Sequence, residues 1–335
     1  MQCMRTTMFR KSIRYQWTCL CVLVFISISM MFSSKKCPRH FSINESMIGT
    51  YDIPNVVHFI TGQGDASESL LDRHGPRLAS RRMERASSEF QLINYLVLLS
   101  ARQHLQPDQL FLHYSIEPTG YWWSKVKDDR QLNLTLHRIP PITSIYEHSV
   151  YHHAHRTDIA RLEILDRYGG IYLDLDVLVL RSFSRLIANP SHVEAIFAWE
   201  NEEFHALSNA VILAPIYSKF LRRLHQSYQS FNSSCWACHS ILLAGQLARI
   251  YSTEVHILPS YTFFRPSWSH IEELYVYNQY DFHENYACHL WNSYVGELFL
   301  SNLTVQSILS PKKMTTFIRM IVHAVGRERL ETLLK

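Results

Sequence analysis

The chain has 335 residues, of which 47% are hydrophobic, 13% aromatic and 19% charged, with only 10 Gly and 12 Pro. This composition predicts a folded protein with a sizeable core and excludes a collagen-like or low-complexity chain. The net charge of +4 comes from the N-terminus: seven of the 33 basic residues and none of the 29 acidic ones precede residue 40, leaving 26 basic against 29 acidic residues. Because so neutral a body lacks a positive field, we expect no nucleic-acid partner.

An apolar stretch near the N-terminus predicts a transmembrane segment. Residues 17–34 carry no charged side chain, and about 20 apolar residues span a bilayer. A cleaved signal peptide is the alternative, but no small-x-small cleavage site follows, and the apolar core exceeds the usual length of roughly 7–15 residues. We therefore expect a cytoplasmic tail over residues 1–16, a signal anchor over 17–34, a stem over 35–50 and a folded domain over 51–335.

Four N-glycosylation sequons indicate on which side of the membrane the folded domain lies. Their asparagines are Asn44, Asn133, Asn232 and Asn302. The basic residues that flank the anchor, four before it and three after it, orient it only weakly. Together with the anchor, the sequons favour a lumenal domain in a type II membrane protein.

Four of the seven cysteines lie beyond the predicted anchor. They are Cys37, Cys235, Cys238 and Cys288. Four cysteines allow three pairings, among which the sequence does not choose. Cys235 and Cys238 have the spacing of a redox motif without thioredoxin-like surroundings, so structural disulfides are the preferred interpretation.

Strands and helices alternate along the folded domain. Strands are predicted at residues 53–60, 109–115, 133–138 and 171–180, and helices at 89–105, 157–168 and 311–335. Thr157 is the predicted N-cap of its helix, and Gly169 and Gly170 are predicted to end it. The alternation predicts an α/β fold with a mainly parallel sheet, and the absence of a Pro/Gly/Ser-rich linker predicts one domain. Whether the last helix packs on this domain is left open.

Two carboxylates interrupt the strand predicted at residues 171–180. Asp174 and Asp176 are two residues apart, so a strand would direct both to one face. Such a pair is costly to bury unless a cation lies beside it, and ligands gather beyond the carboxyl ends of strands in α/β sheets. The pair therefore predicts a metal–diphosphate site. Asp158 and Arg161 share a face of the preceding helix that can overhang this site; alone, they would be a surface ion pair.

These residues resemble the signature of D-x-D sugar transferases. The specific block is Thr157-Asp-x-x-Arg161 followed by Tyr168-Gly-Gly-Ile-Tyr-x-Asp-x-Asp176. The family includes yeast initiating α-1,6-mannosyltransferases, animal α-1,4-galactosyl- and α-1,4-N-acetylglucosaminyltransferases and, more distantly, the glucosylating clostridial toxins. Weaker similarities lie at residues 53–58, 208–214 and 289–292. The resemblance implies the GT-A fold, a Rossmann-type, mainly parallel sheet flanked by helices.

The resemblance also implies a site for a nucleotide sugar and for Mn²⁺ or Mg²⁺. The implied metal ligands are Asp174, Asp176 and His289. The implied donor-binding residues are His58, Thr61, Asp158, Arg161, Asp174, His289 and Trp291, and the implied catalytic residues are Asp158, Arg161, Asp174 and Asp176. Relatives commonly have Trp where this chain has Thr61, which leaves the nucleotide base and its stacking partner open.

The activity implied by the resemblance is retaining transfer of a hexose or N-acetylhexosamine from a UDP-sugar to a glycan or glycolipid in the Golgi. A metal ion and Arg161 would stabilise the departing diphosphate; no nucleophile is assigned, and no oligomer is predicted. Similarity at residues 289–292 favours the animal α-1,4 branch. The alternatives are a GDP-mannose-dependent α-mannosyltransferase, a D-x-D phosphatase and a non-catalytic lumenal sugar-binding relative. Val177-Leu178 does not fit the phosphatase pattern, and the intact carboxylates and Arg161 disfavour the non-catalytic relative.

Two further groups of polar residues are of interest. Glu200 and Asn209 follow the metal strand and either line the sugar pocket or are ordinary loop residues. His152, His153 and His155 are expected to be loop histidines rather than metal ligands, because carboxylates are available.

Overall fold

The computed structural model describes residues 52–63, 89–188, 193–203 and 205–334. All of these belong to one unit, Gly49–Lys335. The predicted tail, anchor and stem, with Cys37 and Asn44, lie outside the described residues. Within the described ranges, no helix has both the length and the apolar character needed to cross a membrane.

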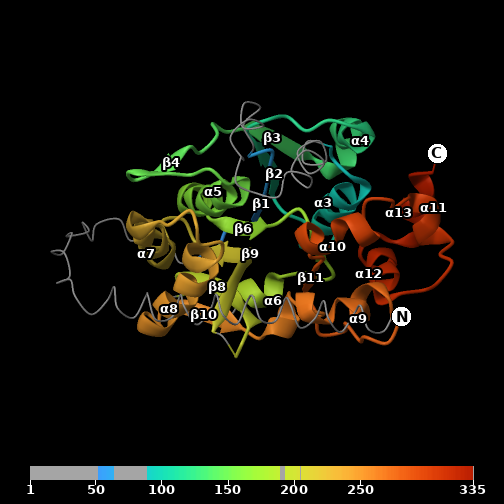
Figure 1. Cartoon of the computed structure of the whole chain (residues 1–335). Helices are drawn as coiled ribbons and strands as arrows, with labels where there is room; N and C mark the ends of the chain where they lie inside the picture. The colour runs from blue at the N-terminus through green and yellow to red at the C-terminus, as the bar shows by residue number, and fades with distance from the viewer. Residues whose placement is uncertain (1–51, 64–88, 189–192, 204, 335) are drawn as a thin grey trace. The chain divides into compact units, whose positions relative to one another are not determined.

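A seven-stranded mixed sheet runs through this unit in the order β10-β8-β9-β6-β1-β2-β3 (Figure 1). Its strands are β1 (Val56–Thr61), β2 (Gln109–Tyr114), β3 (Leu134–Arg138), β6 (Gly170–Leu173), β8 (Ala195–Asn201), β9 (Ala206–Ala214) and β10 (Val255–Leu258). Four of the six strand pairs are parallel, whereas β9 is antiparallel to both of its neighbours. The predicted α/β class with a mainly parallel sheet is therefore confirmed.

Helices cover both faces of the sheet. They are α3 (Leu92–Leu105), α4 (Tyr121–Asp128), α5 (His153–Tyr168), α6 (Ser184–Ile187), α7 (Lys219–Ser227), α8 (Leu243–Ile250), α9 (Ile271–Tyr275), α10 (Asn292–Phe299), α11 (Val305–Leu309), α12 (Thr316–Val325) and α13 (Arg327–Thr332). Alternate residues of β6 serve two cores: Ile171 and Leu173 belong to the core that contains α3 and α12, and Tyr172 packs with the apolar side chains of α5 and α7. This division follows from the two-residue period of a strand.

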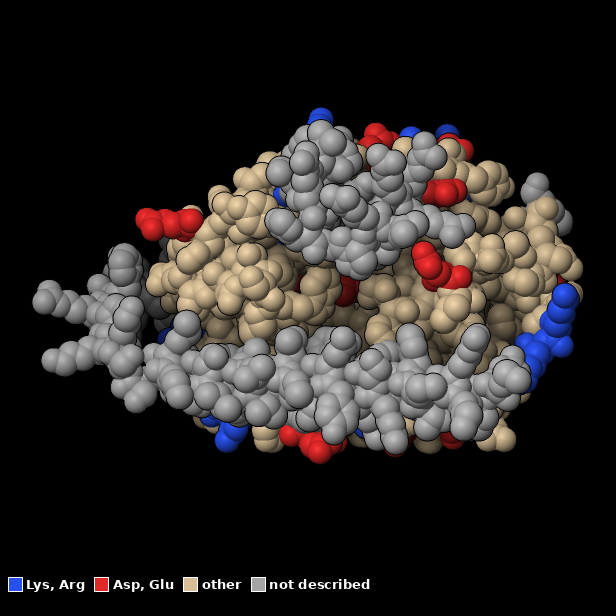
Figure 2. Space-filling view, in the orientation of Figure 1, with Lys and Arg blue, Asp and Glu red and all other residues tan. Residues whose placement is uncertain are grey.

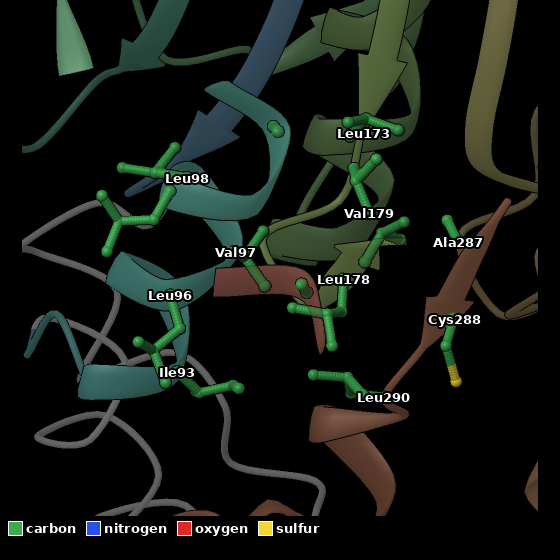
Figure 3. Packing of buried hydrophobic residues seen from close by; sticks show 14 of the residues in the cluster. Ile93, Leu96, Val97, Leu98, Leu173, Leu178, Val179, Ala287, Cys288 and Leu290 are labelled. Carbon is green, nitrogen blue, oxygen red and sulfur yellow. The ribbon is translucent and has the colours of Figure 1, made fainter. Parts of the chain in front are cut away.

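Helix α3 is buried on nearly all sides. Figure 3 shows Ile93, Leu96, Val97 and Leu98 of α3 beside residues of β6, β7 (Val177–Val179) and β11 (Ala287–His289). A helix that is apolar all round is expected inside a large core. The helix predicted at residues 89–105 is thus confirmed, but it begins at residue 92.

The strand predicted at residues 171–180 is two strands in two sheets, so the prediction of one continuous strand was wrong. β6 belongs to the large sheet, whereas β7 pairs antiparallel with β11. Asp174, Leu175 and Asp176 lie in the turn between them, where the Val177 N–H donates to the Asp174 carbonyl over 2.9 Å. An apolar run does not by itself distinguish one long strand from two short ones.

Helix α5 begins one turn before the predicted start. His152 Nδ1 accepts a hydrogen bond from the Ala154 N–H over 3.2 Å, and Thr157 Oγ1 donates to the His153 carbonyl over 3.0 Å. The predicted Thr157 cap was therefore wrong, and His153 and His155 are helical rather than loop residues. Gly169 is the C-cap, as predicted, with a φ of 61° that disfavours a side chain.

The predicted helix at residues 311–335 is two helices, α12 and α13, which meet at Gly326 with a φ of 84°. The inner face of α12, including Phe317, Met320 and Ile321, is buried in the core that contains α3. The C-terminal segment therefore packs on the folded domain.

The described residues on the face in Figure 2 form no basic patch. Among the described residues of that face, Lys and Arg lie scattered toward its edges, and acidic atoms lie at the bottom of a central hollow. This distribution is consistent with the near-neutral composition.

Candidate metal and donor site

Asp174, Asp176 and His289 come together where β6 ends. One ligand atom from each residue lies within 4.8 Å of those of the other two. The two aspartates come from the turn after β6. His289 is the last residue of β11, and it is opposite Val177 in the antiparallel pairing with β7. His289 is far from the two aspartates in the sequence, but it lies beside them because β7, which directly follows the turn, pairs with β11.

Asp176 is held by two partners. His289 Nε2 lies 3.2 Å from Asp176 Oδ1, and the Asn292 N–H, at the start of α10, donates to Asp176 Oδ2 over 2.8 Å. Burial alone would raise the pKa of Asp176, but His289 and the Asn292 N–H lower it below the ordinary value. Burial opposes the charged form of His289, yet Asp176 holds the pKa of this imidazole above its ordinary value.

The chemistry of this group fits a divalent cation. Two carboxylates and an imidazole are ligands that Mn²⁺ or Mg²⁺ can accept, and carboxylate oxygens suit hard cations best. His289 Nδ1 is buried without a hydrogen-bond partner. Buried polar atoms are normally partnered, so an imidazole nitrogen without a partner, in a ring that adjoins two carboxylates, favours a ligand at this place.

Arg161 links α5 to the aspartate turn. Its Nη2 lies 3.3 Å from Asp158 Oδ1 and its Nη1 lies 3.4 Å from Asp174 Oδ1. Nη1 also donates to the Asn209 carbonyl over 2.6 Å, and the guanidinium lies over the ring of Tyr172, 4.6 Å from its centroid. Despite burial, Asp174 and Asp158 hold the pKa of Arg161 above its ordinary value, so this cation is fixed and permanently charged.

Asn209 and Glu200 lie on strands β9 and β8, beside the carboxylates and His289 of the site, and neither is an ordinary loop residue. Asn209 Nδ2 donates to Asp158 Oδ1 over 2.7 Å. Burial raises the pKa of Asp158, and the attraction of Arg161 and this hydrogen bond oppose the rise. Burial likewise raises the pKa of Glu200, which His289 and a hydrogen bond with Ser208 counteract. β8 and β9 thus add polar side chains beside the carboxylates.

The structure does not bring His58 to the group. Its side chain is fully buried on β1, where Nε2 bonds to the Gly169 carbonyl over 3.0 Å and Nδ1 lies 3.1 Å from His113 Nε2. Both ring nitrogens are therefore engaged. Thr61 ends β1, and because His58 pairs with Tyr172 in the parallel register, Thr61 lies at the same sheet edge as the aspartate turn.

Trp291 lies against the group with its indole N–H engaged. The N–H donates to the Pro266 carbonyl over 3.1 Å, and the indole packs 4.0 Å from the ring of His289, centroid to centroid. Its position supports the His289 ring from one side.

Tyr172 also belongs to this group, although the sequence motifs did not assign it a role. Its hydroxyl donates to Asp174 Oδ1 over 2.5 Å while its ring lies under Arg161. The available signal was its place two residues before Asp174, since side chains two apart on a strand share a face. A buried tyrosine hydroxyl also needs a partner.

Comparisons with known proteins identify the family to which the chain belongs. The family model "Glycosyltransferase sugar-binding region containing DXD motif" matches residues 83–193. Glucan organizing enzyme 1 of Cryptococcus neoformans var. grubii is 31% identical over 288 residues, which cover 84% of this chain and 73% of that protein. The chain therefore belongs to the family of glycosyltransferases with a DXD sugar-binding region, and it is a glycosyltransferase.

Other similarities are more remote. The uncharacterized protein At4g19900 of Arabidopsis thaliana is 29% identical over 171 residues, which are 44% of this chain and 26% of that protein. A solved structure of the galactosyltransferase LgtC with donor and acceptor sugar analogues is 12% identical, with a TM-score of 0.36, over 62% of this chain and 74% of LgtC.

Proposed function

We propose that the protein transfers a hexose or N-acetylhexosamine from a UDP-sugar to a glycan or glycolipid, with retention of configuration and with the help of Mn²⁺ or Mg²⁺. The observation that carries the proposal is the convergence of Asp174, Asp176 and His289 within 4.8 Å at the end of β6. A metal-binding group beside a fixed arginine suits the departure of a diphosphate.

Each residue of the group has a distinct task in this reaction. Asp174, Asp176 and His289 would hold the cation, which supplies Lewis-acid stabilisation to the leaving diphosphate when it is bound. Arg161 adds a fixed positive charge, and it orients Asp158 and Asp174 through its two Nη atoms. Asn209 Nδ2 donates to Asp158 Oδ1, the same oxygen that Arg161 contacts. Because these side chains are already ordered, little reorganisation accompanies the reaction.

The proposal also concerns the identity of the donor sugar and of the acceptor. UDP-galactose and UDP-N-acetylglucosamine follow from the resemblance at residues 289–292, and GDP-mannose is the alternative. The name of the Cryptococcus relative adds glucan as an acceptor to test and UDP-glucose as a donor. A difference of one hydroxyl in a sugar pocket changes discrimination by only about 1–3 kcal/mol, so a panel of donors is needed.

We further propose a type II protein of the Golgi membrane, anchored by residues 17–34. Three of the sequon asparagines, Asn133, Asn232 and Asn302, are exposed in the structure, which supports their use as glycan acceptors in the lumen. Loss of apparent mass after treatment of the expressed protein with a glycosidase tests this part; an unchanged mass contradicts it.

Hydrolysis of nucleotide sugars tests the reaction. The full chain, purified in detergent, is incubated with UDP- and GDP-sugars, with and without Mn²⁺. We expect Mn²⁺-dependent release of UDP from one donor, and we expect Asp176→Asn to abolish it because one metal carboxylate is lost. Asp281→Asn is the matched control, since the Asp281 side chain is 73% exposed. Full activity of Asp176→Asn would remove the metal assignment, and release of GDP instead of UDP would favour the mannosyltransferase.

A further inference from the structure

Two buried polar side chains without hydrogen-bond partners follow adjacent strands of the large sheet. Gln63 comes two residues after β1 and is 3% exposed, and Ser115 comes directly after β2 and is 6% exposed. Among the described residues, neither Nε2 nor Oε1 of Gln63 has a partner, and the same holds for Ser115 Oγ. Because a buried donor or acceptor without a partner costs stability, these three atoms indicate a ligand that supplies the missing partners.

The two side chains follow neighbouring strands at the sheet edge that carries the aspartate turn. The parallel pairing of β1 with β2 continues beyond both strands, where the Ile116 N–H donates to the Gly62 carbonyl over 3.0 Å. The two segments approach so closely that residue 62 has no room for a side chain. β1 is also parallel to β6, so its carboxyl end lies at the edge where the turn follows β6. Gln63 and Ser115 therefore lie on the same side of the sheet as the metal-binding group.

The main chain of Gln63 is fixed to helix α5. Arg156 Nη1 donates to the Gln63 carbonyl over 3.1 Å, and Arg156 Nε donates to the Val150 carbonyl over 3.2 Å. Arg156 is 2% exposed and lies two residues before Asp158 on this helix. The main chain is thus held in place while the side-chain amide is left for a ligand, and a site that is fixed before binding loses less entropy when the ligand enters.

The order of the strands indicates which part of the donor reaches Gln63 and Ser115. On one side of β6, β9 and β8 bring Asn209 and Glu200 to the group; on its other side lie β1 and β2, at one and two strand spacings, about 5 and 10 Å. A diphosphate at the metal has its sugar on one side and its nucleoside on the other. With the sugar among Asp158, Asn209 and Glu200, the nucleoside extends toward the ends of β1 and β2.

The chemistry of the two side chains suits a base rather than a phosphate. Both are neutral, whereas phosphate oxygens are usually held by Arg, Lys or backbone N–H groups. Uracil presents a carbonyl oxygen beside a ring N–H, and the amide of Gln63 presents an N–H beside a carbonyl oxygen, so the two can form a pair of hydrogen bonds. The hydroxyl of Ser115 can donate to a carbonyl oxygen of the same ring.

We propose that the Gln63 amide recognises the uracil of the donor, with the Ser115 hydroxyl as a second partner. The proposal rests on the proposed function, which it deepens from the class of donor to the residue that selects the base. It also addresses the position of Thr61, where relatives commonly have Trp. In this chain, hydrogen bonds from the residues that follow β1 and β2 identify the base.

Calorimetric titration with free UDP, CDP and GDP in the presence of Mn²⁺ tests the proposal without turnover. The full chain in detergent is compared with Gln63→Met, which keeps the length of the side chain and removes its polar atoms. We expect UDP to bind this variant about tenfold more weakly or worse, because two hydrogen bonds are lost. The melting temperature of the free variant should equal or exceed that of wild type, because no buried amide is left without partners.

Gln63→Glu tests the selection of the base. A carboxylate accepts hydrogen bonds but does not donate them, so it repels the carbonyl oxygen of uracil and accepts from the amino group of cytosine. We expect the ratio of CDP affinity to UDP affinity to rise about tenfold. The matched control is Gln109→Glu, at an exposed position at the opposite end of β2, which should bind as wild type does. Gln63→Met decides the test if the buried carboxylate of Gln63→Glu prevents folding.

Three results would overturn the assignment of Gln63. They are wild-type affinity for UDP in Gln63→Met, a lower melting temperature of the free Gln63→Met protein, which would make the amide a structural group, and tighter binding of GDP than of UDP by the wild type. The donor assay separates this test from the proposed function. Mn²⁺-dependent UDP release with unchanged UDP affinity in Gln63→Met rejects the base contact alone, whereas UDP binding that depends on Gln63 without release from any donor rejects the transfer reaction.

Discussion

Arg161 is buried between two carboxylates and stands at the centre of the donor site. Its contacts with Asp158, Asp174 and the Asn209 carbonyl use the fork of the guanidinium, which lies at the same time on the ring of Tyr172. A lysine has one point charge on a flexible stem and cannot reproduce this set. The residue therefore has two roles, to neutralise buried charge and to present a fixed cation.

Two substitutions of Arg161 separate these roles. We expect Arg161→Ala to lower the free energy of unfolding by about 3–5 kcal/mol, because it leaves buried carboxylates uncompensated. Arg161→Lys should lose less stability but still lower kcat about 100-fold or more, the scale of one lost charge-stabilising group. Chemical denaturation and donor turnover measure the two effects. Arg167→Lys, on an exposed position of the same helix, is the control, and equal kcat in Arg161→Lys and wild type would contradict the role.

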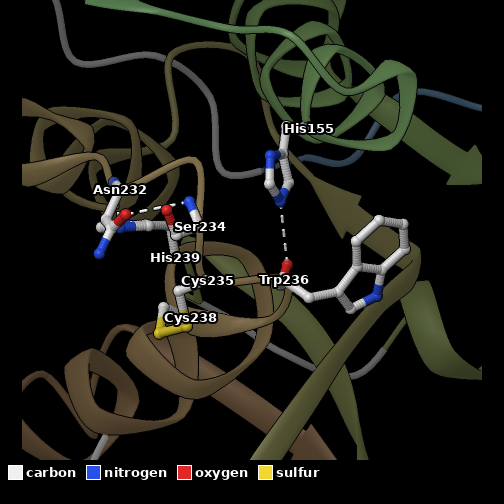
Figure 4. The surroundings of a disulfide bond; sticks show 7 residues. All are labelled: His155, Asn232, Ser234, Cys235, Trp236, Cys238 and His239. Atoms are coloured by element: carbon white, nitrogen blue, oxygen red, sulfur yellow. Dashed lines mark hydrogen bonds between the residues drawn. A yellow bond between two sulfur atoms is a disulfide. The ribbon is translucent and has the colours of Figure 1, made fainter. Parts of the chain in front are cut away.

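At the scale of elements, the Cys235–Cys238 disulfide (Figure 4) closes a short turn at the start of η4 (Cys238–Leu242). Cys238 is the first residue of η4, which continues into α8, while Trp236, inside the disulfide turn, bonds to His155 of α5. Cys288 is a free, buried thiol on β11. The structure thus pairs two of the four candidate cysteines and links the turn to the helix that carries Asp158.

Removal of this disulfide should loosen the turn. For a loop of so few residues, the chain-entropy relation gives a stabilisation of about 2 kcal/mol. We expect Cys235→Ser with Cys238→Ser to lower the free energy of unfolding by about this amount, which chemical denaturation measures. A mild dithiol reductant should bring the wild type to the level of the double variant and leave the variant unchanged. Equal free energies of unfolding in reduced and oxidised protein would show that the disulfide does not stabilise the fold.

At the scale of the whole molecule, the sequence predicts those elements whose pattern is local. The helix that became α3, the first strands and the glycine end of α5 follow from apolar spacing and capping. Asp174 and Asp176 were correctly predicted to lie together, but they lie on a turn rather than a strand. His289 could be added only through the family resemblance, because the β7–β11 pairing that brings it to the aspartates is a long-range contact.

Long-range contacts also decide the role of His58, which the sequence pattern alone does not reveal. A histidine on an apolar strand can line a site or be a satisfied core residue, and only its neighbours decide between the two. His113 and the Gly169 carbonyl, from two other segments, take both of its ring nitrogens.

Three histidines form a hydrogen-bonded row across β1, β2 and β3. His58 Nε2 donates to the Gly169 carbonyl, His113 Nε2 must then donate to His58 Nδ1, and His137 Nδ1 must donate to His113 Nδ1. The rings of His58 and His113 are neutral in this arrangement. Burial lowers the pKa of His58 to about 4, although the hydrogen bond to the Gly169 carbonyl opposes this shift. The pKa of His113 falls to about 3, because the ring is buried and lies beside His58 and His137.

The row makes the stability of the whole domain depend on pH. The unfolded chain binds protons on these two histidines below a pH of about 6.5, whereas the folded chain does not until about 4, so the free energy of unfolding falls as pH falls through this window. Each histidine contributes at most about 1.4 kcal/mol per pH unit, which is about 2 kcal/mol between pH 6.5 and 5. Denaturation curves at several pH values should show the fall, and His113→Asn should reduce the pH slope by about half. His283→Ala, at a side chain that is 73% exposed, should leave the slope unchanged. A slope in His113→Asn equal to that of the wild type would mean that the row does not govern acid stability.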